Sequence, residues 1–486
     1  MAHRHLSQRV VVPVMFVATV FIVIVDGAIT TVALPAIARQ FQLAPARLDA
    51  VVVVYPVCVG VAVPASAWLG DRFGGKRLLL ASMALFAASS ALCGAAGNLG
   101  TLVAFRALQG LAGGLLTPVA GALLFRTFSA RERVRASRVL IFPQQIAPAV
   151  APILGGVLVD GLSWRWVFYV NLPLGLAAVL FGLAFLEPHR PEQHGPEQHG
   201  RRRFDLPGLL LSAGGLAGLT YGICAGSDHG WTSPGILLSL LTGAALLAAT
   251  VHVELRTRDP ILRLTLFRDR LFRDCSVISL IGLIPILGAM FLGPLFIQDA
   301  LGGSAMDSGT STFTEAFGVL LTVQVAGALY ARVGPRAIIG GGLLGVAAVL
   351  VLFSTCDLHT SLWTFRLYMF LLGVAMGGVF MPTTVASMST ISKADMAQAS
   401  TLNTVVRQTA GALAPAVVTT LLVAGGSGAA GSGGAGPSVS TYQDAYLVLA
   451  GIALLSALYA FTLRDGPARQ AATSGIPEPA EPAPVG

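Results

Sequence analysis

The chain has 486 residues, of which 55% are hydrophobic and 11% are charged, and its mean hydropathy is +0.76. Soluble domains carry roughly a quarter charged residues, so this composition excludes an ordinary globular protein and predicts a membrane protein with many spans. A net charge of +8 would also suit a nucleic-acid-binding protein. Here, however, the cations are spread over loops between apolar runs, which is how a membrane protein is oriented, so we expect no nucleic-acid partner.

Apolar runs long enough to cross a bilayer as helices, about 20 residues each, follow one another along the chain. Charged breaks divide them into fourteen predicted spans, at residues 11–34, 48–69, 78–96, 100–125, 137–159, 166–186, 206–225, 234–254, 273–297, 311–331, 337–354, 361–386, 398–424 and 443–463. We therefore predict an all-α polytopic membrane protein with two six-helix bundles, two inserted helices and 14 transmembrane helices in total.

Lysine and arginine gather in the N-terminus and in every second loop, whereas the alternate loops hold only Arg39, Arg47 and Arg165. Basic loops remain in the cytoplasm, so this bias predicts a protein of the inner (plasma) membrane with both termini cytoplasmic. The predicted segments are an N-terminal bundle, a linker with the inserted helices, a C-terminal bundle and a disordered tail, at residues 1–186, 187–271, 272–463 and 464–486. The linker repeats PEQHG at 191–200, and we interpret its histidines as part of a flexible spacer and not as a metal site.

The sequence AWLGDRFGGKRLL at 67–79 predicts a tight turn between two spans, because Gly74 and Gly75 lie within a short charged stretch. Basic residues at a span end are explained by topology, but an acid among them is not. We therefore interpret Asp71, with Arg72, Lys76 and Arg77, as a charge-based latch that forms in one conformation and separates in another. Simple anchoring of the loop is the alternative.

Two sequence repeats indicate that the chain consists of two related halves. The 67–79 turn returns as GALYARVGPR at 327–336, with the acid replaced by Ala331. Arg106 and the following GGLLTP (113–118) return as Arg366 and GGVFMP (377–382). Duplicated bundles that rock about a site at the bilayer midplane are typical of secondary transporters.

Three ionisable residues within the spans are candidates for proton coupling. Asp26 and Glu315 are acids inside predicted spans of the two bundles, and Arg106 lies at a similar expected depth in the fourth span. Burial favours the neutral form of a carboxyl group, which suits a group that must bind and release a proton or pair with a cationic substrate, and a permanent cation nearby favours release. Structural interpretations of these residues remain open. Asp26 could be bonded to the neighbouring backbone, and Glu315 could lie at the outer boundary of the membrane. Arg366 and Arg407 could be packing residues or could extend to the membrane surface.

The predicted fifth span contains APAVAPILGG at 147–156. Small residues allow neighbouring helices to approach closely, and Pro148 and Pro152 remove backbone hydrogen bonds, so this segment predicts a smooth and kinked seam ending in Gly155 and Gly156. Ordinary membrane packing would explain the same residues.

These stretches resemble the major facilitator superfamily, and specifically its fourteen-helix drug:proton antiporter family. AWLGDRFGGKRLL resembles the loop motif G-x-L-a-D-r-x-G-r-k, LVAFRALQGLAGG the motif l-x-x-x-R-x-x-q-G, and APAVAPILGG the antiporter motif G-x-x-x-G-P-x-x-G-G. VDGAITTVALP is similar to the first-helix motif l-D-x-T-v-v-N-v-A-L-P, and WRWVFYVNLPLG (164–175) is similar to a stretch typical of the fourteen-helix members. The chain departs from these motifs at five positions. Ala67, Ala147 and Ala151 stand where the motifs have glycine. Gly75 replaces a basic residue, and Thr31 replaces asparagine.

The resemblance implies a proton-coupled exporter of small lipophilic drugs or antibiotics, neutral or cationic, with Asp26, Arg106, Asp71 and the two prolines in the family's functional positions. The sequence contains no Walker A motif, so neither an ATP-driven pump nor an enzyme is expected. We expect a monomer whose partners are its substrate, protons and the bilayer, with the proton gradient in place of a cofactor. Proton-coupled uptake and a non-transporting sensor or scaffold with the same fold are the alternatives.

Overall fold

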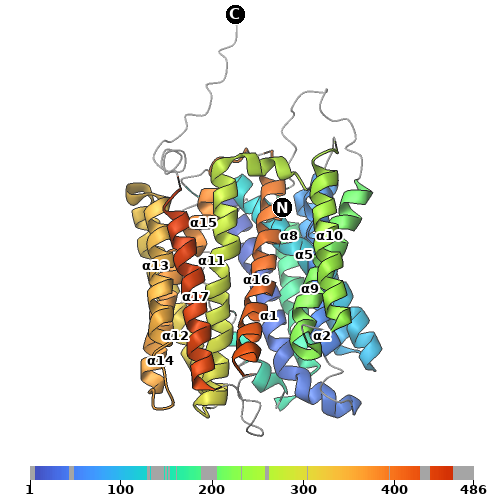
Figure 1. Ribbon diagram of the computed structural model, residues 1–486. Helices are drawn as coiled ribbons and strands as arrows, with labels where there is room; N and C mark the ends of the chain where they lie inside the picture. Colours follow the sequence, from blue (N-terminus) through green and yellow to red (C-terminus); the bar gives the residue numbers. More distant parts are fainter. Residues whose placement is uncertain are drawn as a thin grey trace, which may run out of the picture.

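The computed structural model consists of long helices packed side by side (Figure 1). It describes residues 6–42, 49–128, 132, 147, 150–151, 154–159, 161–187, 205–230, 233–257, 262–303, 305–392, 394–426 and 438–463. The histidine-containing repeat, the C-terminal tail and most of the predicted fifth span lie outside these residues. The predictions for those segments, and the four segment boundaries, stay predictions.

The N-terminal half supplies seven described helices. They are α1 (Gln8–Phe41), α2 (Asp49–Ala62), α3 (Ala65–Phe73), α4 (Gly75–Gly94), α5 (Leu99–Thr127), α7 (Trp166–Tyr169) and α8 (Asn171–Phe185). The inserted pair is α9 (Leu206–His229) and α10 (Pro234–Glu254). We call the side on which α1 begins and α5 ends the N-terminal face.

The C-terminal half begins with a short 3-10 helix, η2 (Leu264–Arg268), on the N-terminal face. It continues through α11 (Arg270–Leu295), the π-helical turn η3 (Phe296–Ala300), α12 (Ala305–Val333), α13 (Pro335–Phe353), α14 (Leu362–Gly377), α15 (Phe380–Ser387), α16 (Met396–Gly426) and α17 (Val439–Ala460). In Figure 1 most of this half lies to the left, and α2, α9 and α10 lie to the right. Its helix α16 and helix α1 of the other half lie between them.

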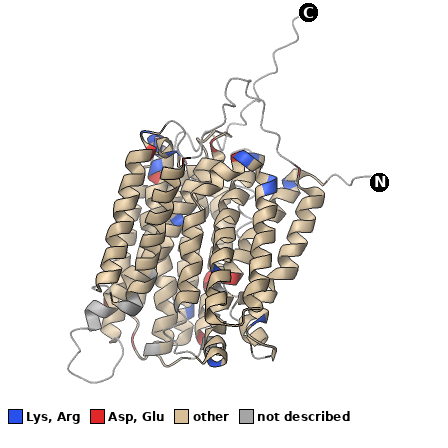
Figure 2. Ribbon diagram, turned by 90° about the vertical axis from the view of Figure 1, so that its right-hand side faces the viewer, with Lys and Arg blue, Asp and Glu red and all other residues tan. Residues whose placement is uncertain are grey.

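Twelve of the described helical segments are long and apolar enough to cross a membrane, and the pair α2 and α3 makes a thirteenth when counted as one bent span. Large apolar side chains cover the outside, for example Leu238 and Leu241 of α10, which are 64% and 69% exposed. Such a surface is stable only against lipid. Charged residues gather near the two ends of the helices (Figure 2). The all-helical membrane fold is thus confirmed, while the count of fourteen spans stays a prediction.

Several of the predicted spans are interrupted helices, including the span predicted at 166–186, which is divided at Val170 between α7 and α8. The span predicted at 48–69 bends by 56° between α2 and α3, where Pro64 caps α3 and lacks the amide hydrogen that a continuous helix needs. The span predicted at 361–386 is interrupted at Gly378, between α14 and α15. The helix of the first predicted span extends beyond it at both ends, from Gln8 to Phe41, and Asp26 lies near the middle of that helix.

Close helix packing confirms that the halves are related. A Cβ on Gly110 of α5 would lie 2.6 Å from the carbonyl oxygen of Tyr55 in α2, and one on Gly373 of α14 would overlap the carbonyl oxygen of Glu315 in α12. One turn further, Gly114 meets the Val59 carbonyl and Gly377 meets the Val319 carbonyl. The same spacing in both pairs makes α2 with α5 the counterpart of α12 with α14.

The two turns predicted as copies also have the same backbone conformation. Gly74 joins α3 to α4 with φ of +85°, and Gly334 joins α12 to α13 with φ of +88°. Residues with a Cβ rarely adopt such angles, which explains why both turns contain glycine at this position. Both turns lie on the N-terminal face.

The inserted helix α9 lies where the halves meet. It packs against α2 of the first half and α16 of the second, with α10 on its outer side (Figure 1). A cavity of about 240 Å³ remains between these helices, lined among others by Gly60 of α2, Leu216 of α9 and Gln408 of α16. The sequence predicted the inserted pair but not this position.

Candidate functional site

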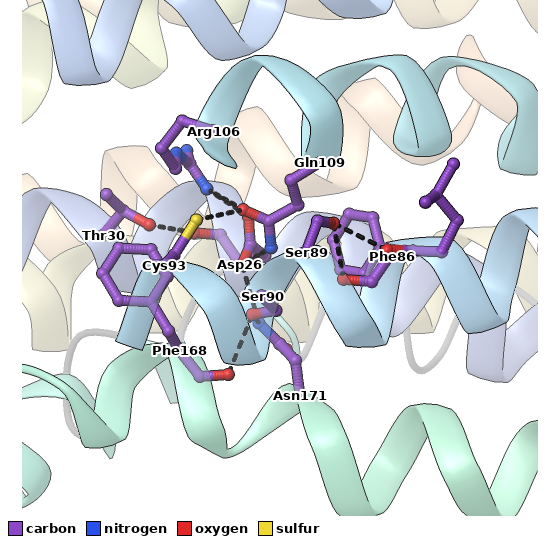
Figure 3. A network of polar contacts seen from close by, with 11 residues as sticks. Asp26, Thr30, Phe86, Ser89, Ser90, Cys93, Arg106, Gln109, Phe168 and Asn171 are labelled. Carbon is purple, nitrogen blue, oxygen red and sulfur yellow. Dashed lines mark hydrogen bonds and ion pairs between the residues drawn. The ribbon is translucent and has the colours of Figure 1, made fainter. Parts of the chain in front are cut away.

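A buried carboxylate is the centre of a polar network in the N-terminal half (Figure 3). Asp26 of α1 has no exposed surface. Arg106 donates from Nη1 to its Oδ2 at 2.7 Å, while Gln109 and Asn171 donate from their side-chain amides to its Oδ1 at 2.7 and 2.6 Å. Three donors from two further helices therefore hold both oxygens of one carboxylate.

The helices explain why these groups converge. Arg106 and Gln109 are three residues apart in α5 and therefore share one face of that helix. Arg106 Nη1 also donates to Gln109 Oε1 at 2.8 Å, which directs the amide nitrogen of Gln109 toward Asp26. Asn171 is the first residue of α8, so its side chain extends from a helix end that faces α1.

Further hydrogen bonds hold the side chains that donate to Asp26 in place. Ser90 of α4 donates to the Phe168 carbonyl at 2.8 Å, and Asn171 donates to Ser90 Oγ at 3.1 Å. The Sγ of Cys93 lies 3.8 Å from Gln109 Oε1. With these partners the amide of Asn171 cannot rotate without losing a hydrogen bond, so the geometry around Asp26 is set before any ligand arrives.

The guanidinium of Arg106 balances the carboxylate charge. Arg106 is 2% exposed, and its Cζ lies 4.4 Å from the ring centroid of Tyr55 in α2 and 5.8 Å from that of Phe168. Breaking such a buried pair by removing one charge costs about 3–5 kcal/mol, because the other charge stays uncompensated. The pair is therefore stable only while both members are ionised and in place.

A cavity of about 440 Å³ lies between the two halves. Its walls come from α1, α2 and α5 on one side and from α11, α15 and α16 on the other. Tyr55 lines this cavity and also stacks on Arg106, so its ring contacts both the cavity and the charged network.

The cavity wall is largely apolar with a polar strip. Apolar side chains include Phe16, Val20, Val23, Ile24, Leu283, Leu287 and Phe380, and polar ones include Thr117, Thr384, Ser400, Asn403, Thr404, Arg407 and Gln408. Such a composition, with a few polar groups among apolar ones, is typical of sites for small lipophilic ligands.

Side-chain contacts join the halves at the N-terminal face. Ser66 Oγ of α3 lies 2.8 Å from Thr401 Oγ1 of α16, and Ser400 Oγ donates to the Pro118 carbonyl of α5 at 2.9 Å. Ala67, Ala122 and Ala397 form a small apolar cluster beside them. These contacts join α3 and α5 to α16 on the N-terminal side of the cavity.

Glu315 lies in α12 of the other half, and the structure does not bring it together with Asp26. Its side chain is buried at 2% exposure, and neither carboxyl oxygen has a hydrogen-bond partner among the described residues. It does not belong to the residues that line the cavity. Asp26 and Arg106 thus form one network as their similar depth suggested, while Glu315 is a separate buried acid.

The turn residues have different surroundings. Asp71 lies 3.6 Å from Arg126 at the end of α5, which fits a contact with a neighbouring helix, although both helices belong to the same half. Lys76 donates to the carbonyls of Leu183 and Leu186 at the end of α8. Arg72 and Arg77 are exposed.

Pro148 and Pro152 lie outside the described residues. Of the same motif, Gly155 is described and faces α1, where an added Cβ would lie 3.0 Å from Ile29 and 3.1 Å from Val32. Gly156 has no atom within 4 Å of such a Cβ. At Gly155, the described part of the motif therefore has the close helix packing that the sequence predicted.

Sequence reasoning did not assign roles to Gln109, Asn171 or Tyr55. The signal was present for the first two, because Gln109 lies in the LVAFRALQG stretch and Asn171 in the WRWVFYVNLPLG stretch, both of which resemble family motifs. Tyr55 lies in an apolar run without a motif. Only the packing of α2 against α5 shows its position.

Comparison with known proteins places the fold in a family. The sequence profile of the Major Facilitator Superfamily matches residues 16–415 and 278–485. The multidrug resistance protein B homolog of Mycobacterium tuberculosis is 31% identical over 402 residues, which is 82% of this chain and 73% of the relative. The multidrug transporter protein MdtP of Bacillus subtilis is 29% identical over 391 residues, or 80% of this chain and 71% of the relative.

Two solved structures have a similar fold. The human organic anion transporter MFSD10 superposes with a TM-score of 0.67 and 14% identity, covering 94% of this chain and all of that one. The proton:xylose symporter XylE superposes with a TM-score of 0.62 and 14% identity, covering 94% and 96%. The two structures show the fold, and the profile match with the 31% identical relative shows that the chain is a transporter of the major facilitator superfamily.

Proposed function

We propose that this transporter exports small lipophilic molecules in exchange for protons, by alternating access to the cavity between its halves. The observation that carries the proposal is the buried Asp26–Arg106 pair, which Tyr55 connects to the cavity because its ring contacts both. A buried acid whose charge is balanced by a permanent cation has two states of different geometry, ionised and protonated, which is what coupling to a proton requires.

The network suggests how a proton changes the structure. When Asp26 is ionised, its two oxygens accept from Arg106, Gln109 and Asn171. When it binds a proton, it loses its charge and one oxygen becomes a donor, so the guanidinium is left uncompensated and must move or find another anion. Because the Tyr55 ring stacks on Arg106 and also lines the cavity, such a movement reaches the substrate site.

The contacts at the N-terminal face represent one of the two access states in this proposal. Ser66 with Thr401 and Ser400 with Pro118 hold the halves together on that side. The basic loops of the sequence favour a cytoplasmic position of this face, and in this proposal the structure represents the state that is closed to the cytoplasm. Rocking of the halves about α5 and α16 would break these contacts and open the cavity to the cytoplasm.

The multidrug names of the relatives support a drug-like substrate, as does the largely apolar cavity. The test is transport into inverted membrane vesicles, whose interior corresponds to the outside of the cell. An acidic interior should drive uptake of an uncharged lipophilic dye such as N-phenyl-1-naphthylamine. Dissipating the pH gradient should abolish it. Failure of a broad dye panel to accumulate would refute the proposed export, and accumulation only with the opposite gradient would indicate proton-coupled uptake.

A further inference from the structure

The cavity between the halves has one charged side chain on its wall. Of the described residues that line it, Arg407 is the only one with a full charge, and none is Asp or Glu. The predicted fifth span, whose packing is mostly outside the described residues, adds no acid either, because the sequence from Arg138 to Val159 contains none. The cavity is therefore electropositive.

Arg407 also has no acidic partner among the described residues. Its Cζ lies 5.0 Å from the ring centroid of Phe380 in α15, on the same side of the cavity, and it forms no ion pair with any described residue. Counted from the start of α16 at Met396, it lies roughly 16 Å into the helix at 1.5 Å per residue. A cation at that depth is costly unless it faces water or an anion.

The other two arginines within the spans differ from Arg407 in this respect. Arg106 pairs with Asp26 at 2.7 Å. Arg366 lies 3.6 Å from Asp307 and donates to Thr310 at 3.0 Å. Only Arg407, of the three, points its charge into a cavity with no acid to balance it, so the missing partner is best supplied by a ligand.

We propose that the cavity binds amphiphilic organic anions, with the acidic group on Arg407 and the apolar body against the walls. A guanidinium offers a planar fork of donors that matches a carboxylate, sulfonate or phosphate, and such charge-assisted hydrogen bonds are about twice as strong as neutral ones. The rest of the cavity is lined by apolar side chains, among them Phe16 and Ile24 of α1 and Leu283 and Leu287 of α11. The part of the ligand that does not contact Arg407 must therefore be apolar. This inference rests on the proposed function for the role of the cavity.

The sequence left a cationic substrate open, mainly because of the buried acid Glu315. Because Glu315 does not line the cavity, no acid there is available to attract a cation, and Asp26 is already paired. The charge of the cavity thus favours anions over cations among lipophilic molecules, by attraction to Arg407 and by repulsion of positive groups.

The test compares two fluorophores that share one ring system. The full-length protein in lipid nanodiscs is titrated with 1-anilinonaphthalene-8-sulfonate, which is an anion, and with its uncharged analogue N-phenyl-1-naphthylamine, and the signal of empty nanodiscs is subtracted. We expect the wild type to bind the sulfonate more tightly. Arg407→Gln should weaken sulfonate binding on the order of tenfold or more and change binding of the neutral analogue less than twofold.

Two further variants make the result interpretable. Arg407→Lys keeps the charge and should retain most of the preference for the sulfonate, and Arg366→Gln, outside the cavity, should leave it unchanged. Equal affinity of the wild type for both fluorophores, or displacement of the neutral one by tetraphenylphosphonium more readily than by the sulfonate, would overturn the proposal without any variant. Binding is measured without a pH gradient, so failure of proton-driven transport would refute the proposed function and leave this result unaffected.

Discussion

Asp26 shows how far a single residue can be interpreted from sequence. An acid in an apolar span must be paired, neutral or in contact with water, so its importance could be predicted. Its pairing with Arg106 was suggested by similar depth. Its amide partners Gln109 and Asn171 were not predicted, because hydrophobic pattern does not report which faces of α5 and α8 meet α1.

Replacing Asp26 by Asn tests the network at the scale of one residue. Asn has the same shape and can still accept a hydrogen bond, but it cannot gain or lose a proton. We expect Asp26→Asn to lose dye accumulation driven by a pH gradient while retaining exchange of labelled for unlabelled dye across proteoliposomes. Both fluxes are measured on the same preparation.

Asp307→Asn is the matched control for that experiment, because Asp307 is an acid of α12 that pairs with Arg366 outside the network. It should keep gradient-driven accumulation. If Asp26→Asn accumulated dye as the wild type does and with the same dependence on pH, Asp26 would have no part in coupling.

Glu315 leads to a different prediction. A carboxylate with no hydrogen-bond partner is costly to bury, whereas an uncharged amide of the same shape is less so. Glu315→Gln should therefore raise the midpoint of thermal unfolding by a few degrees, as measured on purified protein, and should reduce proton-driven transport. A lower midpoint would show that Glu315 has a stabilising partner, and unchanged transport would remove it from the mechanism.

At the scale of helices, sequence predicted existence better than shape. Apolar length predicted the spans, but the break between α2 and α3 and the break at Gly378 depend on a single proline or glycine within an apolar run. The turns at Gly74 and Gly334 were predicted, since charged residues and glycine together leave few alternatives to a tight turn. The role of α9 between α2 and α16 depends on packing that a sequence pattern does not contain.

The glycine contact between α12 and α14 can be tested directly. A methyl group on Gly373 would overlap the Glu315 carbonyl oxygen, so Gly373→Ala should destabilise the C-terminal half by about 1–3 kcal/mol through overpacking. Thermal unfolding of the purified protein is the measurement. Gly451→Ala in α17 is the control, because no atom lies within 4 Å of its added Cβ, and an equal loss in both variants would argue against tight α12–α14 packing.

At the scale of the whole molecule, the duplicated halves were predicted from two repeats and are confirmed by the matching glycine contacts. Their chemistry is not duplicated. By the spacing of those contacts, Met369 and Leu372 of α14 take the places of Arg106 and Gln109. The predicted match of Arg106 with Arg366 was therefore wrong in register, and among the described residues the charged network has no counterpart on α14. The position of the charged network in the N-terminal half could be predicted from Asp26 and Arg106. The relative arrangement of the two halves could not be predicted.

Closure at the N-terminal face predicts that a covalent bond there stops transport. Ser66 and Thr401 approach through their hydroxyl oxygens at 2.8 Å, so the double variant Ser66→Cys, Thr401→Cys should form a disulfide under mild oxidation and lose dye efflux, and dithiothreitol should restore it. Each single variant is the control. Full transport by the cross-linked protein would show that these contacts do not open during the cycle.

The central claim is that substrate and protons move in opposite directions through one molecule. It is tested most directly in proteoliposomes without an initial pH gradient, where a substrate gradient is imposed and a pH indicator is followed inside. The account predicts proton movement opposite to the substrate in the wild type, and none in Asp26→Asn. Proton movement in the same direction as the substrate, or none in the wild type, would contradict it.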